Sequence, residues 1–193
     1  MIKRVITIIL IISLTLISCI SCSTAKTLDQ DERSRPETVS FTDSAGRIVE
    51  VPSNITRIAA SGPMSQIVLF PLAADLLVGL AGKWDSNTEK YIDKKYLELP
   101  VLGQFYGKGD LNLEELAKAD PQVIIDVGES KPGIAEDMDS IMNQVGIPTV
   151  HIQANTETMA DAYRPLGKLL KRESEAEVLA RYCEEVLNEL EDI

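Results

Sequence analysis

The chain has 193 residues and a formal net charge of −11. This length is enough for one domain with a proper hydrophobic core. So acidic a chain is a poor partner for nucleic acid or for anionic lipid headgroups, which both attract basic surfaces. Its three cysteines and single histidine predict neither a disulfide framework nor a dedicated zinc site.

Residues 1–18 have the pattern of a bacterial signal peptide. A short basic start precedes the apolar run Val5–Ser18, which is shorter than the roughly 20 residues of a transmembrane helix. The run ends in Leu-Ile-Ser-Cys19, which resembles a lipobox, so we expect Cys19 to be lipidated. Cys22 is a weaker second candidate, and an uncleaved membrane anchor is the alternative for the whole segment. Without residues 1–18, which hold two cations and no acidic residue, the net charge becomes about −13.

The segment 19–38 is mostly polar and charged, and we interpret it as a tether between the lipid and the folded body. Two β-prone runs follow, Val39–Thr42 and Arg47–Val51. The residues between them, Asp43 to Gly46, have the composition of a turn. The pattern predicts an N-terminal β-hairpin.

From Arg57 onward, short β-prone runs alternate with helical patterns. This alternation is typical of an α/β domain, a three-layer sandwich with a mostly parallel sheet. The clearest run, Val123 to Val127, is continuously apolar, as in strands buried on both faces. His151 lies in another run, where a packed or rim position is expected. The predicted strands are Arg57–Ala60, Leu77–Leu80, Val101–Leu102, Val123–Asp126 and Thr149–Ile152, and the predicted helices are Asn112–Lys118, Gly133–Val145, Thr156–Leu170 and Ser174–Leu190.

Two predicted helices begin with the residue pair of a capping box, Asn112 with Glu115 and Ser174 with Glu177. The last helix carries apolar residues along one stripe. That stripe consists of Val178, Leu179, Tyr182, Val186, Leu187 and Leu190.

Ligands of open parallel sheets bind beyond the carboxyl ends of the strands. Four loops at these ends open with glycine, or with serine and glycine. Glycine lets the backbone approach a ligand, aromatic rings could stack on a flat or apolar ligand, and lysines could meet an anionic one. Each residue alone is compatible with an ordinary surface loop, but the set together predicts a binding rim. This predicted rim comprises Gly62, Pro63, Met64, Lys83, Trp84, Phe105, Tyr106, Lys108, Glu129 and Lys131.

The sequence carries no motif of a catalytic or cofactor site. It has no GxSxG or HExxH motif, and the loop at 103–109 lacks the ending of a phosphate-binding loop. The serines lie far from the single histidine in sequence. Neighbouring carboxylates, such as Asp137 with Asp139 and Glu184 with Glu185, fall on predicted helix surfaces and are expected to be solvated. We therefore expect a protein that is not an enzyme and uses no cofactor.

A series of segments in fixed order resembles one known family. After the lipoprotein signal come the hairpin, the Leu-Val-Gly-Leu run at 77–80, the Asn-Leu-Glu-Glu-Leu segment at 112–116, Ala-Asp-Pro-Gln-Val-Ile-Ile at 119–125, Gly-Ile-Pro-Thr-Val at 146–150 and Leu-Gly-Lys-Leu-Leu at 166–170. The order resembles the substrate-binding lipoproteins of ABC importers for iron–siderophore complexes, haem and cobalamin. The resemblance runs from about Val39 to Leu190.

The resemblance implies two α/β lobes joined by one long helix, with the ligand held between them and delivered to a membrane permease. By this reading, residues 39–172 form the N-terminal lobe and residues 173–193 the start of the linking helix, with no second lobe. An iron–siderophore, haem or corrinoid ligand is implied, as is a location on the extracytoplasmic face of the membrane. The family docks an acidic residue of each lobe onto permease arginines, and Glu114 matches the first. A carboxylate stabilising the helix dipole is the alternative role for Glu114.

Two other functions remain open. One is a membrane-tethered interaction module, or a fragment, that has lost transport and pairs through its last helix with another protein. The other is an enzyme on the same scaffold, for which the sequence offers no catalytic residues.

Overall fold

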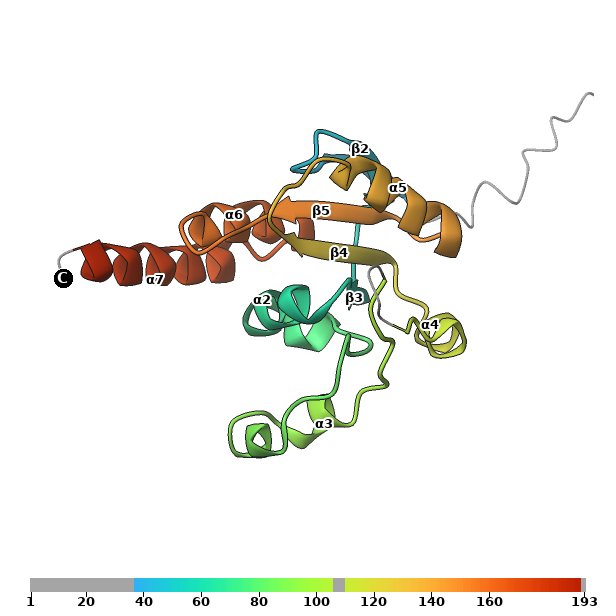
Figure 1. Cartoon of the computed structure of the whole chain (residues 1–193), viewed down its shortest axis with the longest axis horizontal. Coiled ribbons are helices and arrows are strands. Elements are labelled where there is room, and N and C mark those ends of the chain that lie inside the picture. Colours follow the sequence, from blue (N-terminus) through green and yellow to red (C-terminus); the bar gives the residue numbers. More distant parts are fainter. Residues whose placement is uncertain (1–36, 106–109, 192–193) are drawn as a thin grey trace, which may run out of the picture. The chain divides into compact units, whose positions relative to one another are not determined.

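The computed structural model describes residues 37–105 and 110–191, so the predicted signal peptide, Cys19 and most of the predicted tether lie outside the described residues. Figure 1 shows a small parallel sheet with helices on both sides, a β-hairpin and a C-terminal helix. The strands are β1 (Thr38–Thr42), β2 (Ile48–Pro52), β3 (Ile58–Ala60), β4 (Val123–Gly128) and β5 (Thr149–Gln153). The α-helices are α2 (Pro63–Ala73), α3 (Lys94–Leu97), α4 (Leu113–Ala119), α5 (Ile134–Val145), α6 (Met159–Leu170) and α7 (Glu173–Glu191), with 3-10 turns at Ala74–Leu76 and Ser86–Lys90.

The predicted hairpin is confirmed, and its turn is held by Asp43. β1 and β2 pair antiparallel, with Phe41 opposite Val49. One oxygen of the Asp43 carboxylate accepts from the backbone N–H groups of Ala45 and Arg47, at 3.0 and 2.9 Å. Its other oxygen accepts from the backbone N–H of His151 in β5 at 3.2 Å. The turn therefore satisfies backbone groups of the sheet as well as its own.

The central sheet is parallel, in the order β3-β4-β5. Because side chains alternate along a strand, β3 and β4 each contribute to two separate apolar clusters, whereas β5 contributes to one. Ile58, Ile125 and Ile152 pack with α2, α6 and the start of α7 on one face, whereas Ala59 and Ile124 pack with α4 and α5 on the other. This arrangement confirms the predicted three-layer α/β architecture.

Two predicted strands are wrong. Leu77 to Leu80 and Val101–Leu102 form only single bridges, Ile58 with Leu77 and Leu80 with Val101. Both runs still bring their apolar side chains inward, since Leu77, Leu80 and Leu102 are at most 4 % exposed.

The predicted helices form, but neither capping box closes as predicted. The Asn112 side chain accepts from the Glu115 N–H at 3.1 Å, yet the Asn112 N–H donates to the carbonyl of Leu102 at 2.8 Å. The Glu115 carboxylate instead pairs with Lys118. At the second site α7 already begins at Glu173, which places Ser174 inside the first turn.

The last two helices pack tightly against each other. Gly167 of α6 lies so close to α7 that a Cβ there would be 2.5 Å from the Cβ of Ala176. One face of α7 is covered in this way, and Ala176 and Ala180 are at most 1 % exposed. The predicted stripe is only partly covered, because Leu179 packs against the core whereas Val178 and Tyr182 are 69 % and 64 % exposed. Within the described ranges, no helix combines the length and the apolar character that crossing a bilayer requires.

Candidate ligand-binding site

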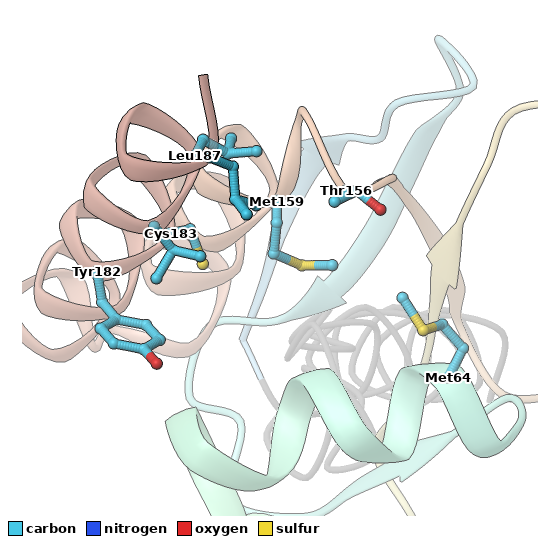
Figure 2. Close-up of a pocket in the computed structure, with 8 residues that line it drawn as sticks. Met64, Thr156, Met159, Tyr182, Cys183 and Leu187 are labelled. Carbon is cyan, nitrogen blue, oxygen red and sulfur yellow. The ribbon is translucent and has the colours of Figure 1, made fainter. Parts of the chain in front are cut away.

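An apolar groove lies near the carboxyl end of the sheet. It has a volume of about 300 Å³. Figure 2 shows Met64 of α2 and Met159 of α6 on one side of it and Tyr182, Cys183 and Leu187 of α7 on the other. The lining is completed by Thr156, Val186 and Leu190. We call this surface the α7 groove.

The groove combines elements that the chain order keeps apart. Met64 lies in the first turn of α2, shortly after the end of β3. Gly62, in an extended conformation, caps this helix, and Pro63 is its first residue. Proline suits that position because its fixed φ fits the first turn and no N–H is lost. Thr156 follows β5 in the turn that leads into α6, where the Asn155 side chain accepts from the Thr158 N–H at 2.9 Å. The segments after β3 and β5 thus both reach α7, the first with Met64 and the second with Thr156 and Met159.

The groove is electrically neutral. Cys183 is the one sulfhydryl in its wall, and burial raises the pKa of that thiol, with the nearby Glu184 carboxylate acting in the same direction. The thiol is therefore protonated at neutral pH. Methionine, cysteine and leucine offer a soft, adaptable surface that suits a ligand with a large apolar face.

Of the predicted rim residues that the structure describes, only Met64 lines the α7 groove. Gly62 and Pro63 position it. Tyr106 and Lys108 lie outside the described residues.

Lys83 and Trp84 lie in a loop that α2 holds in place. The Gln66 side chain, which is buried, accepts from the Ala81 N–H at 2.7 Å and donates to the Gly82 carbonyl at 3.3 Å. Lys83 is exposed. Trp84 is half-buried against Phe70 of α2, with ring centroids 5.1 Å apart in an edge-to-face arrangement. This loop therefore forms a second rigid patch, which does not contribute to the α7 groove.

Phe105 lies in the core. It is 6 % exposed and belongs to the cluster that contains Ile124 and Met138. Its backbone N–H donates to the carbonyl of Ser61 at 3.0 Å. Burying an aromatic ring beside the sheet is more favourable in free energy than exposing it to solvent. Phe105 is therefore a core residue and not part of a ligand-binding surface.

The loop after β4 carries Glu129 and Lys131, both exposed. The Lys131 ammonium lies 2.8 Å from the Asp137 carboxylate of α5. The Asp137 carboxylate therefore partly neutralises the Lys131 ammonium, which was predicted to meet an anionic ligand.

Sequence reasoning missed most of the groove. Thr156 and Met159 follow the fifth predicted strand, and the same rule that selected the other loops could have found them. The α7 residues Tyr182 and Leu187 belong to the apolar stripe, whose pattern alone is equally compatible with pairing with another protein.

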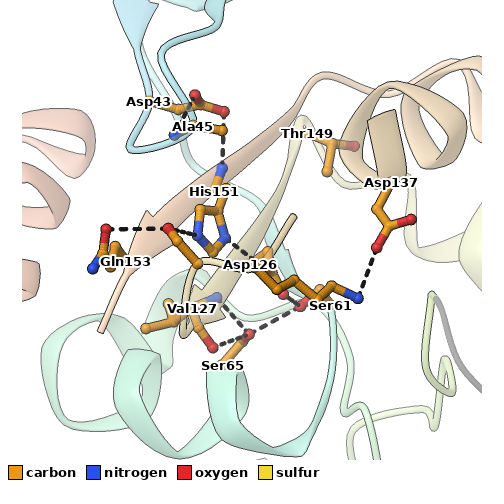
Figure 3. Close-up of polar contacts among 12 residues, drawn as sticks. Asp43, Ala45, Ser61, Ser65, Asp126, Val127, Asp137, Thr149, His151 and Gln153 are labelled. Atoms are coloured by element: carbon orange, nitrogen blue, oxygen red, sulfur yellow. Dashed lines mark hydrogen bonds and ion pairs between the residues drawn. The ribbon is translucent and has the colours of Figure 1, made fainter. Parts of the chain in front are cut away.

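A buried polar row crosses the sheet behind the rim. Asp126 and His151 are paired in register on β4 and β5, and Figure 3 shows their contacts. His151 Nδ1 lies 2.7 Å from one Asp126 oxygen, and Ser61 Oγ lies 2.5 Å from the other. All three residues are at most 1 % exposed. The expectation that His151 is packed is confirmed, and its partner is a carboxylate.

Among the described residues, no group of three His, Cys, Asp or Glu side chains is placed to hold a metal ion. Glu114 stands apart from the groove, in the first turn of α4. Its side chain is 80 % exposed and pairs with Lys118 at 2.8 Å.

No protein-family model and no curated protein matches this chain. Its fold, in contrast, matches solved structures. An ABC transporter solute-binding protein from Sulfurospirillum deleyianum is 27 % identical with a TM-score of 0.68, over 78 % of this chain and 48 % of that one. A periplasmic solute-binding protein from Veillonella parvula is 22 % identical with a TM-score of 0.62, over 81 % and 48 %. The molybdate-binding protein MolA of Haemophilus influenzae is 18 % identical with a TM-score of 0.52, over 74 % and 49 %.

The chain thus spans about half the length of these solved proteins. What the whole proteins bind or deliver does not pass to it from the likeness alone. The described residues have the fold of one lobe of an ABC-transporter solute-binding protein.

Proposed function

We propose that this chain is the N-terminal lobe of an extracytoplasmic solute-binding lipoprotein that captures a ligand for an ABC importer and does not convert it. The observation that carries the proposal is the α7 groove, an apolar site at the carboxyl end of a parallel sheet in a lobe of this fold. Such edges are where α/β sheets bind ligands. Lipidation of Cys19 would hold the lobe at the membrane surface.

The lining favours a ligand with a broad apolar face. Met64, Met159 and Leu187 offer no charge and few hydrogen bonds, which suits a ferric siderophore, a haem or a corrinoid better than a small oxyanion. Molybdate, the ligand of one of the similar proteins, would find no cationic side chain among the residues that line this groove. The exposed Lys83 and the half-buried Trp84 offer a separate contact for a larger chelate.

Direct titration tests the proposal. The purified chain without residues 1–22 is titrated with haemin, ferrioxamine B, cyanocobalamin and molybdate by calorimetry. We expect saturable binding of one of the three large ligands, weakened at least about tenfold in Met64→Lys, since a buried charge opposes an apolar contact. Ile67→Lys is the matched control, because Ile67 is also exposed on α2 but does not line the groove.

Absence of binding by a folded, monodisperse protein would contradict an autonomous receptor lobe. Tight molybdate binding would contradict the ligand class while leaving the role in transport intact. The two parts of the proposal therefore fail separately.

A second function is favoured by the exposed stripe on α7. Val178, Tyr182 and Leu190 are each more than half exposed, and exposed apolar stripes of this kind mark interaction surfaces. An interaction module would bind no solute and would associate through this face. Concentration-dependent dimerisation in analytical ultracentrifugation, lost in Val178→Lys, would support this function over the first.

A further inference from the structure

The polar row behind the rim ends in an exposed hydroxyl. Ser130, in the loop after β4, places Oγ 3.3 Å from His151 Nε2. The other ring nitrogen of His151 lies 2.7 Å from Asp126. Ser130 is exposed, whereas His151 and Asp126 are buried. A serine, a histidine and an aspartate thus stand in the spatial order of a nucleophile, a base and an orienting carboxylate.

The buried partners fix which nitrogen is the base. An ionised carboxylate only accepts hydrogen bonds, so the Nδ1–H of His151 donates to Asp126. In the neutral imidazole Nε2 then carries the lone pair, and it faces the Ser130 hydroxyl. Deprotonation of that hydroxyl by Nε2 is the step that makes a serine oxygen nucleophilic.

Four further contacts keep the relay rigid. The second Asp126 oxygen accepts from Ser61 Oγ at 2.5 Å, and Ser61 Oγ lies 2.9 Å from Ser65 Oγ. Ser65 Oγ in turn accepts from the Val127 N–H at 2.8 Å. The backbone of His151 is held by Asp43. A preorganised base loses little freedom when it accepts a proton.

Gln153 competes with the base. Ser130 Oγ donates to Gln153 Oε1 at 3.1 Å, and the hydroxyl has a single proton to give. A half-turn of the amide would let Gln153 donate to Oγ instead, which frees the hydroxyl proton for His151. Removing the amide oxygen should therefore increase reactivity.

We propose that Ser130 is a nucleophilic serine, activated by His151 and Asp126, that accepts acyl groups from activated carboxylic esters and phosphonyl groups from fluorophosphonates. In acylation, Oγ bonds to the ester carbonyl carbon while its proton moves to Nε2. The bond from that carbon to the leaving alkoxide then breaks, and the alkoxide takes the proton from Nε2 to leave as an alcohol. With a fluorophosphonate, the Oγ–P bond forms, the P–F bond breaks, fluoride leaves and the proton passes through His151 to solvent. The proposal covers this single transfer and is independent of solute capture.

The test is labelling of the whole purified chain with an alkyl fluorophosphonate at pH 8, followed by intact mass and peptide mapping. We expect one adduct, located on Ser130 and absent in Ser130→Ala. Ser174→Ala, which alters another exposed serine remote from the histidine in sequence, should label as the parent chain does. Both substitutions are at exposed positions, so both variants should fold.

Two further variants separate activation from mere exposure. Asp126→Asn should lower the labelling rate at least about 100-fold, as loss of general-base catalysis does, in a protein whose circular dichroism is unchanged. Gln153→Ala should label faster than the parent chain. An absent adduct under conditions that label a known serine hydrolase, or an adduct that persists in Ser130→Ala, would overturn the proposal.

Discussion

Arg164 on α6 reaches two carboxylates on α7. Its Nε lies 3.1 Å from Glu177 and its Nη2 lies 2.6 Å from Glu184. The two carboxylates are seven positions apart, two turns along the same side of α7. One guanidinium thus links α6 to α7, the helix that forms one wall of the α7 groove.

Replacing Arg164 should loosen this helix pair in a pH-dependent way. The hydrogen bond from Arg164, with a smaller contribution from Arg181, holds the pKa of Glu177 below its ordinary value of 4.5. A carboxyl group whose pKa is lowered by folding stabilises the fold fully at pH values above its ordinary pKa. This stabilisation is lost as the pH falls through the folded-state pKa. Arg164→Met should therefore lower the Tm at pH 7, and by a smaller amount as the pH is lowered below 4.5, measured by circular dichroism.

Arg181→Met is the control, because Arg181 is 67 % exposed and pairs with Glu177 of its own helix. Such exposed pairs contribute little, so its Tm should stay close to that of the parent chain throughout this pH range. Equal effects of the two substitutions would contradict the special role of Arg164.

Gly167 should tolerate no side chain. A Cβ there would lie 2.5 Å from the Cβ of Ala176 and 3.2 Å from the Arg172 carbonyl oxygen, so α6 and α7 would have to separate. Overpacking of this kind costs about 1–3 kcal/mol. Gly167→Ala should lose stability in that range in urea titration, whereas Gly82→Ala, where a Cβ meets nothing within 4 Å, should not.

The sheet and the longer helices were predictable because their signal is local. The run at 123–127 is apolar throughout, and a strand buried on both faces requires that composition. α5 shows its apolar side in the spacing of Met138, Ile141 and Val145. The runs at 77–80 and 101–102 carried the same local signal, but strand formation there depends on partners that chain order alone does not reveal.

The site was harder to predict, because it depends on packing between distant segments. Phe105 follows a glycine-opened loop as a ligand-stacking ring would, yet its side chain turns into the core beside Ile124. Trp84 also follows a glycine, yet its ring packs edge-to-face against Phe70 of α2 and is half-buried. The approach of Ser130 to His151 depends on the register of β4 against β5, which the sequence does not specify.

Asp43 should be one of the most sensitive positions outside the core. Its fully buried carboxylate pairs with Arg47 at 3.0 Å and accepts backbone N–H groups from the turn and from His151. Asp43→Ala leaves a largely buried guanidinium without this partner, a change that costs about 3–5 kcal/mol. Urea unfolding measures the loss. Asp139 is the other carboxylate that pairs with Arg47, and its side chain is 55 % exposed. Asp139→Ala should therefore lower the free energy of unfolding far less.

Trp84 should be replaceable by phenylalanine with little loss of stability. Among the described residues, its indole Nε1 is buried without a hydrogen-bond partner. Removing an unsatisfied donor relieves a desolvation cost that offsets the smaller ring. We expect Trp84→Phe to stay within about 1 kcal/mol of the parent chain in urea titration. A loss of more than about 3 kcal/mol would show that the indole N–H has a partner in the folded protein.

If the chain serves an ABC importer as we propose, Glu114 should contribute to binding of the permease and little to the stability of the lobe. Its side chain is 80 % exposed, and its ion pair with Lys118 is shared with Glu115. The loss of one carboxylate from the first turn of α4 costs only a few tenths of a kcal/mol. If Glu114 docks onto permease arginines, Glu114→Lys should weaken binding to the cognate permease in nanodiscs at least about tenfold, because it sets like charges against each other across the interface. Ligand affinity should stay unchanged.

Glu115→Lys is the matched control, because Glu115 is one position along the same turn and less exposed. This variant should bind the permease nearly as well as the parent chain. An equal loss of binding in both variants would indicate an effect of net charge and not a docking contact.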